Sequence, residues 1–330
     1  MLDHKIIAEI GSVHDGSFGN ALKLIELAAH CGANLVKFQT HLAGAETLET
    51  APSPSYFRAE SRFDYFERTA FTVAQWKALA AHCLANDVEF LSSPFSLEAV
   101  DLLEEVGVSA YKIASGEVTN IPLLEHVAKT GKPVLLSSGM SNWAELDQAV
   151  TLLQSSPELV VMQCASRYPC PPEKVGLNVI AEMRQRYKLP VGFSDHTTGN
   201  AAALAAAALG CVVVEKHLTF SKAMYGSDAA NAMEPAEFSA FCNSLKDVWA
   251  MQANPVDKDD ISDFKDMKAI FEKSIVSAVA LESGTVVSFQ DLAFKKPGDG
   301  IPAKDYMNVV GRKLRRDVPY NIQLKFQDFE

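Results

Sequence analysis

The chain has 330 residues, of which 48% are hydrophobic and 22% charged, as expected for an ordinary globular protein with one large domain and a small one. Its formal net charge of −11 argues against nucleic acid or an anionic membrane surface as a partner. Because the six cysteines form no C-x-x-C pair and no stretch reads as a signal peptide or a bilayer span, we expect reduced core cysteines and a cytoplasmic location.

Apolar β-type runs alternate with amphipathic helical patterns along most of the chain. The eight candidate strands are Ile6–Ile10, Leu35–Gln39, Val88–Ser92, Ala110–Ile113, Val134–Ser137, Leu159–Gln163, Val191–Ser194 and Val213–Lys216. The helical patterns are Asn20–Cys31, Val73–Ala85, Leu97–Val106, Ile121–Lys129, Asn142–Leu153, Asn178–Arg186, Asn200–Leu209 and Pro235–Ala250. Eight such repeats predict an α/β fold of the (β/α)8 TIM barrel type, with its active site at the carboxyl ends of the strands. A doubly wound sheet is the competing architecture, but the first β-α turn has no G-x-G-x-x-G.

The composition changes after the last helical pattern. We expect a barrel domain over residues 1–253, a polar and proline-marked linker over 254–272, and a small β-rich domain over 273–330. A domain of that size is marginally stable alone, so we expect it to dock on another surface.

Two apolar runs end in a histidine beside a carboxylate, at His196 and His217. The Ala-rich segment between them has the length of one helix, so the two strands are expected to be parallel neighbours. Alternation puts Ser194 on the face of His196, and Glu215 on the face of His217. Two strand-end imidazoles facing one cavity could hold a divalent metal ion, and the alternative is a pair of buried core histidines.

Polar residues recur where the other predicted strands end. They are Glu9, Lys37, Gln39, Ser92, Ser93, Lys112, Ser115, Glu117, Ser137, Ser138, Ser166 and Tyr168. Lysines, hydroxyl groups and nearby glycines together suit a phosphate or a phosphorylated enol acid, because they supply point charges, neutral donors and close backbone N–H groups.

Several of these segments carry a resemblance to a known family. The segments are Ile7–Gly11, Val36–Thr40, Ser92–Phe95, Tyr111–Glu117, Ser138–Met140 and Ser194–Thr197. They resemble the sialic acid synthases, or nonulosonic acid synthases. The tail resembles that family's antifreeze-like SAF domain at Lys296–Ile301 and Gly311–Leu314, so the resemblance covers essentially the whole chain.

The resemblance implies that phosphoenolpyruvate condenses with an N-acetylmannosamine-like amino-sugar aldehyde, giving a nine-carbon 2-keto-3-deoxy acid and phosphate. The residues implied for phosphoenolpyruvate are Lys37, Ser93, Lys112, Ser115, Ser137, Ser194 and Ser166, the last in place of a common asparagine. His196 and His217 would bind Mn²⁺ or Mg²⁺. The sugar residues would be Glu9, Gln39, Tyr168 and Asp228, with Glu117 near the reacting carbons.

The family resemblance also implies a homodimer with swapped tails, in which a tail residue of one subunit reaches the N-acetyl group of the sugar in the other. That residue is usually arginine, and here it is Lys296. The family's Asn-His after the first strand is Val13-His14 here. Since lysine lacks the planar fork of arginine, the sugar is expected to be either N-acetylmannosamine or a 2,4-diacetamido hexose.

The chemistry of the residues agrees with this reaction. Carbon 3 of the enol attacks the aldehyde, water adds to carbon 2 with Glu9, Glu117 or a metal-bound water as base, and phosphate leaves by C–O cleavage. One rival is a Schiff-base aldolase with Lys112 or Lys37 as nucleophile. Another is a non-catalytic carbohydrate-binding or ice-binding protein, which predicts a degraded pocket.

Overall fold

A computed structural model describes residues 2–52, 60–226 and 228–330 of the chain. The chain forms two compact units, Met1–Asn254 and Pro255–Glu330. None of the helices in the described part is long and apolar enough to cross a membrane.

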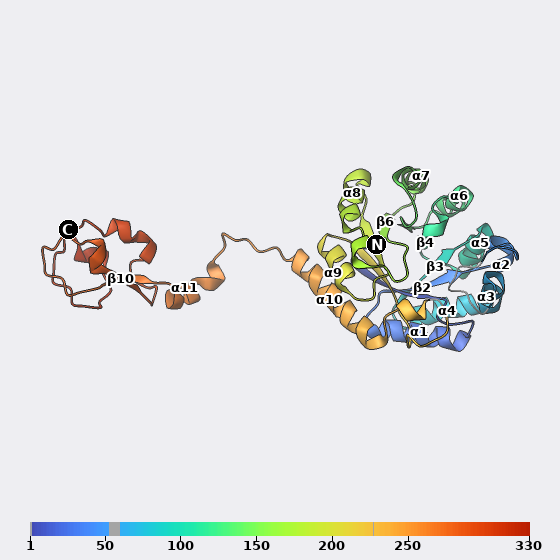
Figure 1. The fold of residues 1–330 in the computed structure, drawn as a ribbon, viewed down its shortest axis with the longest axis horizontal. Helices are drawn as coiled ribbons and strands as arrows, with labels where there is room; N and C mark the ends of the chain where they lie inside the picture. Colours follow the sequence, from blue (N-terminus) through green and yellow to red (C-terminus); the bar gives the residue numbers. More distant parts are fainter. Residues whose placement is uncertain (1, 53–59, 227) are drawn as a thin grey trace. The chain divides into compact units, whose positions relative to one another are not determined.

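The first unit is a closed barrel of eight parallel strands in sequential order (Figure 1). The strands are β1 (Lys5–Gly11), β2 (Leu35–Thr40), β3 (Glu89–Pro94), β4 (Tyr111–Ile113), β5 (Val134–Ser137), β6 (Leu159–Cys164), β7 (Val191–Asp195) and β8 (Val213–His217). Strand β1 closes the ring by pairing with both β2 and β8. The predicted TIM barrel is therefore confirmed.

An outer ring of helices covers the strands (Figure 1). These helices are α1 (Phe18–Cys31), α4 (Val73–Ala85), α5 (Leu97–Val106), α6 (Ile121–Lys129), α7 (Trp143–Leu153), α8 (Leu177–Tyr187), α9 (Ala201–Ala208) and α10 (Pro235–Ala253). Two further helices that we did not predict, α2 (Ala43–Glu46) and α3 (Arg62–Thr69), lie between β2 and α4. Tyr65 and Phe66 of α3 pack with Ala43 of α2 in a small apolar cluster of their own.

The N-caps explain where several helices begin. Ser17, Thr72, Ser96 and Asn142 each accept a hydrogen bond from the backbone N–H three residues later. Such a cap satisfies an N–H that has no partner within the helix and contributes about 1 kcal/mol.

Alternation along each strand separates two layers of side chains. In β1, Ile6, Ala8 and Ile10 pack outward in the large core between strands and helices. Ile7 points inward, where it meets Leu35 and the other residues that fill the lower barrel. Because the period is two, the next inward position of β1 is Glu9 at the carboxyl end. The same alternation places polar side chains from the other strands in the barrel mouth.

The strand register decides which of these polar residues are neighbours. Glu9 pairs with Lys37 of β2 on one side and with His217 of β8 on the other. Ser194 of β7 pairs with Glu215 of β8. The barrel therefore brings together residues from the beginning and the end of its sequence.

The second unit contains helix α11 (Lys265–Phe271) and an antiparallel pair, β9 (Ser274–Ser277) and β10 (Leu292–Lys295). Its own apolar core includes Ile275, Leu292 and Leu324. The carboxylate of Asp328 is fully buried and accepts a hydrogen bond from Arg316 Nε at 2.7 Å. The antiparallel pair lies in the small β-rich tail that the sequence predicts, whereas α11 lies within residues 254–272, where a linker was expected.

Candidate active site

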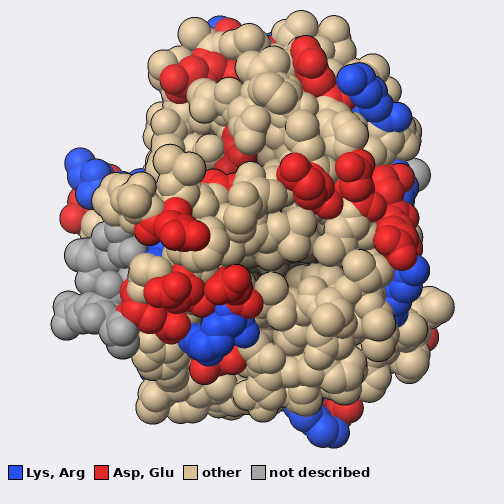
Figure 2. All heavy atoms as spheres, turned by 90° about the vertical axis from the view of Figure 1, so that its right-hand side faces the viewer, with Lys and Arg blue, Asp and Glu red and all other residues tan. Residues whose placement is uncertain are grey.

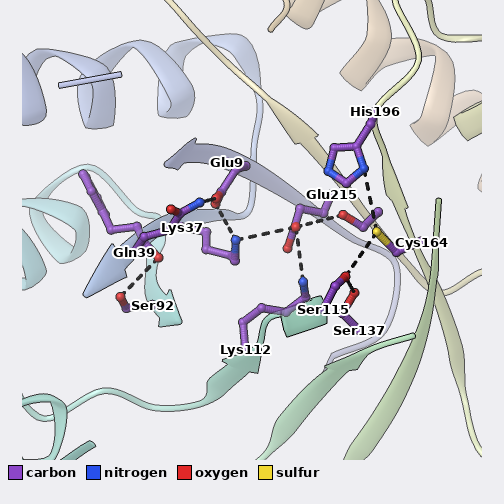
Figure 3. A network of polar contacts seen from close by, with 12 residues as sticks. Glu9, Lys37, Gln39, Ser92, Lys112, Ser115, Ser137, Cys164, His196 and Glu215 are labelled. Atoms are coloured by element: carbon purple, nitrogen blue, oxygen red, sulfur yellow. Dashed lines mark hydrogen bonds and ion pairs between the residues drawn. The ribbon is translucent and has the colours of Figure 1, made fainter. Parts of the chain in front are cut away.

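A buried carboxylate lies at the centre of the barrel mouth and connects lysines from two strands (Figure 3). Glu215 Oε1 lies 3.3 Å from Lys112 Nζ and 3.6 Å from Lys37 Nζ, and it accepts a hydrogen bond from Ser194 Oγ at 3.0 Å. Lys37 Nζ also lies 2.7 Å from Glu9 Oε2. All five side chains are buried, so their charges interact through protein more than through water.

These contacts shift the ionisation of the central groups. Burial raises the pKa of the Glu215 carboxyl, but Lys112 and Lys37 outweigh burial and lower the pKa to about 2. Burial lowers the pKa of Lys37, but the carboxylates of Glu215 and Glu9 leave it above its ordinary value. Both lysines therefore face carboxylates in a site that remains charged at neutral pH, as binding of an anionic substrate requires.

Hydroxyl groups form a second cluster beside the lysines. Ser115 Oγ and Ser137 Oγ lie 2.8 Å apart, and both Ser115 and Ser166 lie close to Cys164 Sγ, at 3.6 Å in each case. Gly139 makes this close approach feasible, because a Cβ there would come within 2.3 Å of Ser115 Oγ and 2.1 Å of Ser166 Oγ. The serines expected from β4, β5 and the loop after β6 are thus brought together.

Ser93, by contrast, has a buried Oγ with no hydrogen-bond partner among the described residues. It pairs in register with Gln39 of β2. An unpaired buried hydroxyl is costly unless a ligand or water satisfies it, and this suits a ligand-binding position.

The two predicted histidines face each other, with ring centroids 5.7 Å apart. Burial lowers the pKa of His217 and favours the neutral imidazole, the form that binds metals. Its Nδ1 is buried and has no hydrogen-bond partner in the described part of the chain. His196 Nδ1 lies 3.3 Å from the Ala165 carbonyl oxygen, an outer contact typical of a histidine whose other nitrogen is a ligand.

These histidines fit a divalent ion that takes its remaining ligands from substrate and water. Among the described residues, no group of three or more His, Cys, Asp or Glu side chains could enclose a metal ion. A site with two protein ligands leaves most coordination positions open, in contrast to a closed structural site.

Lys216 of β8 holds the loop that carries His196 in place. The buried Lys216 Nζ donates to Asp195 Oδ2 at 2.8 Å, to the Thr197 carbonyl oxygen at 2.5 Å and to the Gly199 carbonyl oxygen at 2.8 Å. Lys216 points away from the barrel interior because it alternates with Glu215 and His217. It therefore serves the geometry of the loop and does not line the mouth.

The residues expected to hold the sugar are Glu9, Gln39, Tyr168 and Asp228. Gln39 Nε2 donates to Glu9 Oε1 at 2.8 Å, and the Tyr168 ring lies 4.2 Å from the His196 ring between centroids. Asp228 follows β8 in the chain, and its Oδ2 accepts from both the backbone N–H and the hydroxyl of Ser12 at 3.2 Å. These four expected residues thus come from β1, β2 and the segments after β6 and β8.

Glu117 follows β4 and lines a polar cavity of about 440 Å³. Burial raises the pKa of its carboxyl, although Asn120 donates to Oε2 at 2.8 Å. Glu46 and Arg62 line the same cavity. Acidic side chains also gather around a hollow on the side of the molecule where α2, α3 and α5 lie (Figure 2).

Lys296 is the one expected site residue that belongs to the second unit, where its Nζ lies 4.8 Å from the Phe271 ring centroid.

Two residues at the mouth, Glu215 and Cys164, were missed as site residues. The sequence placed Glu215 on the face of His217, but the contact with both lysines requires the closed barrel. Cys164 is free and buried, as expected of all six cysteines, yet its Sγ lies 3.7 Å from His196 Nδ1. Burial raises the pKa of this thiol, but His196 and Lys112 outweigh it and lower the pKa to about 6.

Comparison with known proteins agrees with this architecture. The sequence profile of the NeuB family matches residues 24–257, and that of the SAF domain matches residues 272–330. An N,N'-diacetyllegionaminic acid synthase of Campylobacter jejuni is 35% identical over 316 residues, covering 93% of this chain and 94% of that protein. The human N-acetylneuraminate-9-phosphate synthase is 32% identical over 317 residues, covering 94% and 88%.

A solved structure gives the same assignment. The N-acetylneuraminic acid synthetase of Leptospira borgpetersenii, crystallised with citrate, aligns with a TM-score of 0.71 at 27% identity and covers 81% of this chain and 90% of its own. The profile match spans more than half of the chain, and relatives above 30% identity align over nearly all of it. The chain therefore belongs to the NeuB family of N-acetylneuraminate synthase-like transferases and ends in a SAF domain.

Proposed function

We propose that this enzyme condenses phosphoenolpyruvate with an N-acylated hexosamine in its aldehyde form, giving a nine-carbon 2-keto-3-deoxy acid and phosphate. The observation that carries the proposal is that the barrel mouth holds two buried lysines, Lys37 and Lys112, both beside Glu215, together with the Ser115–Ser137 hydroxyl pair. Two ammonium groups beside neutral donors match a small ligand that carries a carboxylate and a phosphate. Ser93, Ser166 and Ser194 complete this half of the proposed site.

The sugar half is proposed to consist of Glu9, Gln39, Tyr168 and Asp228. The 35% identical relative makes a product with two acetyl groups, so we place a 2,4-diacetamido hexose first and N-acetylmannosamine second. Lys296, in place of the usual arginine, agrees with a sugar that differs around its acetamido group. We further propose a homodimer in which the tail domain of one subunit supplies Lys296 to the other.

His196 and His217 would hold Mn²⁺ or Mg²⁺, which when bound supplies positive charge that polarises the aldehyde oxygen. The lysines neutralise phosphoenolpyruvate as its carbon 3 forms a bond to the aldehyde carbon. Water then adds at carbon 2, and the C–O bond to phosphate breaks. Glu9 is already paired with Lys37, whereas burial raises the pKa of Glu117 and makes its carboxylate the stronger base, so we assign removal of the proton from water to Glu117.

A phosphate-release assay with phosphoenolpyruvate and a panel of hexosamines tests the proposal, with product mass read by spectrometry. Turnover should stop in EDTA and return with Mn²⁺, and His196→Ala and His217→Ala should bind Mn²⁺ more weakly while retaining the fold. With phosphoenolpyruvate carrying ¹⁸O at the bridging oxygen, the label should leave in phosphate. Label retained in the keto acid, or full turnover in chelator, contradicts the mechanism.

The Schiff-base alternative requires a lysine that is easily deprotonated. Glu215 and Glu9 raise the pKa of Lys37, so this lysine is harder to deprotonate than an ordinary one. Treatment with borohydride and pyruvate should therefore leave Lys37 unmodified, and we expect the same of Lys112, whose Nζ lies 3.3 Å from Glu215 Oε1. A covalent pyruvyl adduct on either lysine would favour the aldolase.

A further inference from the structure

A chain of four polar side chains runs from helix α2 to strand β1. Glu46 Oε1 lies 2.8 Å from His41 Nδ1, and His41 Nε2 lies 3.1 Å from Gln39 Oε1. Gln39 Nε2 then donates to Glu9 Oε1 at 2.8 Å. The proposed function uses Gln39 and Glu9, whereas His41 and Glu46 have no role in it.

The direction of these hydrogen bonds follows from the groups at the two ends. The Glu9 carboxylate only accepts, so Gln39 turns its amide nitrogen toward Glu9 and its carbonyl oxygen toward His41. The Glu46 carboxylate also only accepts. His41 therefore has an oxygen atom within hydrogen-bond distance of each ring nitrogen, Glu46 Oε1 on one side and Gln39 Oε1 on the other. With its oxygen beside His41 and its nitrogen donating to Glu9, the amide of Gln39 has one favourable orientation.

The His41 ring is also fixed by its aromatic neighbours. Phe66 and Phe95 stack on its two faces, with centroid separations of 3.7 Å and 4.1 Å and interplanar angles of 7° and 19°. The side chains of His41 and Glu46 are 9% and 4% exposed. The stack prevents the ring from turning away from its hydrogen-bond partners.

We propose that His41, oriented by Glu46, is a positioning residue that holds the Gln39 amide in the orientation required to bind the sugar. The inference rests on the proposed function, in which Gln39 contacts the sugar. It predicts a selective effect, because the lysines and serines proposed for phosphoenolpyruvate form no hydrogen bond or ion pair with His41 in the described part of the chain.

The first test is His41→Phe, which keeps an aromatic ring between Phe66 and Phe95 and removes both hydrogen bonds. The KM for the sugar should rise about tenfold, while the KM for phosphoenolpyruvate should change less than about twofold. The matched control is His82→Phe, because His82 Nε2 lies 3.3 Å from Glu26 Oε1 in a similar pair between the outer helices α4 and α1. This control should leave both KM values unchanged.

A second pair of variants separates orientation from packing. Glu46→Gln keeps an oxygen that accepts from His41 Nδ1–H and should retain most of the sugar affinity, whereas Glu46→Leu should raise the sugar KM as His41→Phe does. If His41→Phe does not fold, Glu46→Leu still tests the inference. Equal kinetics for the two Glu46 variants, or an equal rise in both substrate KM values, would overturn the inference.

Gln39→Ala distinguishes the failure of this inference from failure of the proposed function. If Gln39→Ala leaves the sugar KM unchanged, Gln39 does not bind the sugar and the proposed sugar site is wrong. If Gln39→Ala raises the sugar KM but His41→Phe and Glu46→Leu do not, the sugar site stands and His41 is a packing residue only.

Discussion

Replacing Glu215 with glutamine tests whether the two lysines of the barrel mouth depend on one buried carboxylate. Lys37 would keep Glu9 at 2.7 Å, but Lys112 forms no ion pair with any other carboxylate in the described residues. Removing one partner of a buried ion pair costs about 3–5 kcal/mol, and the remaining amide oxygen still accepts a hydrogen bond, so we expect about 3 kcal/mol. For a domain of this size, that lowers the Tm by about 6–12 °C.

Thermal unfolding followed by circular dichroism measures this change. The control is Glu89→Gln, which removes an exposed ion pair with Lys5 at 2.9 Å and should cost less than about 1 kcal/mol. Phosphoenolpyruvate should raise the Tm of Glu215→Gln more than that of the unchanged protein. Without the negative charge of Glu215, the positive charges of the two lysines are less neutralised and attract an anion more strongly. A Tm equal to that of Glu89→Gln refutes the central role of Glu215.

Further predictions concern the same mouth and the tail. The pKa of Glu215 is lowered to about 2 in the folded protein. The stabilisation that its ionised form contributes should therefore be complete above pH about 4.5 and disappear as the pH falls toward 2. When the free energy of unfolding is measured against pH, Glu215→Gln should lack this part of the acid-induced loss. Lys216→Met should weaken Mn²⁺ binding about 10- to 100-fold in a calorimetric titration, since the loop carrying a proposed ligand loses its anchor. Gly139→Ala should raise the KM for phosphoenolpyruvate, because its Cβ would displace two hydroxyl groups, whereas Gly44→Ala, with open space around it, should not. Lys296→Arg should change the sugar KM alone; unchanged sugar kinetics would contradict the proposed swapped dimer.

The barrel could be predicted because each strand is a short buried run bounded by polar residues, and each outer helix shows one apolar face. The predicted strand Leu35–Gln39 and the observed β2 (Leu35–Thr40) differ by one residue. The segment around α2 and α3 was not predicted, because α2 is only four residues long and α3 begins after a stretch without clear periodicity. Their stability comes from burying Tyr65 and Phe66, a tertiary effect that local sequence does not reveal.

The candidate site was predictable as a set of strand ends but not as a network. Alternation alone placed Glu215 and His217 on one face, yet only barrel closure brings lysines from β2 and β4 to the same carboxylate. Cys164 was expected in the core, and it is buried there, but its contact with His196 depends on the loop conformation after β6. His41 follows the predicted second strand, and its role depends on Glu46 of the unpredicted α2.

The pairing of Glu9 with His217 has a consequence for how the protein is made. The amino-terminal strand leaves the ribosome first and must wait for the last strand of the ring before its edge is covered. Until that moment, only one of the two histidines faces the mouth, and Glu215 is missing between the lysines. A chain that lacks β8 therefore lacks one of the two proposed metal ligands, and a metal bound at the proposed site would stabilise only molecules that have completed the ring. Metal binding at that site would thereby favour finished barrels over partly folded ones.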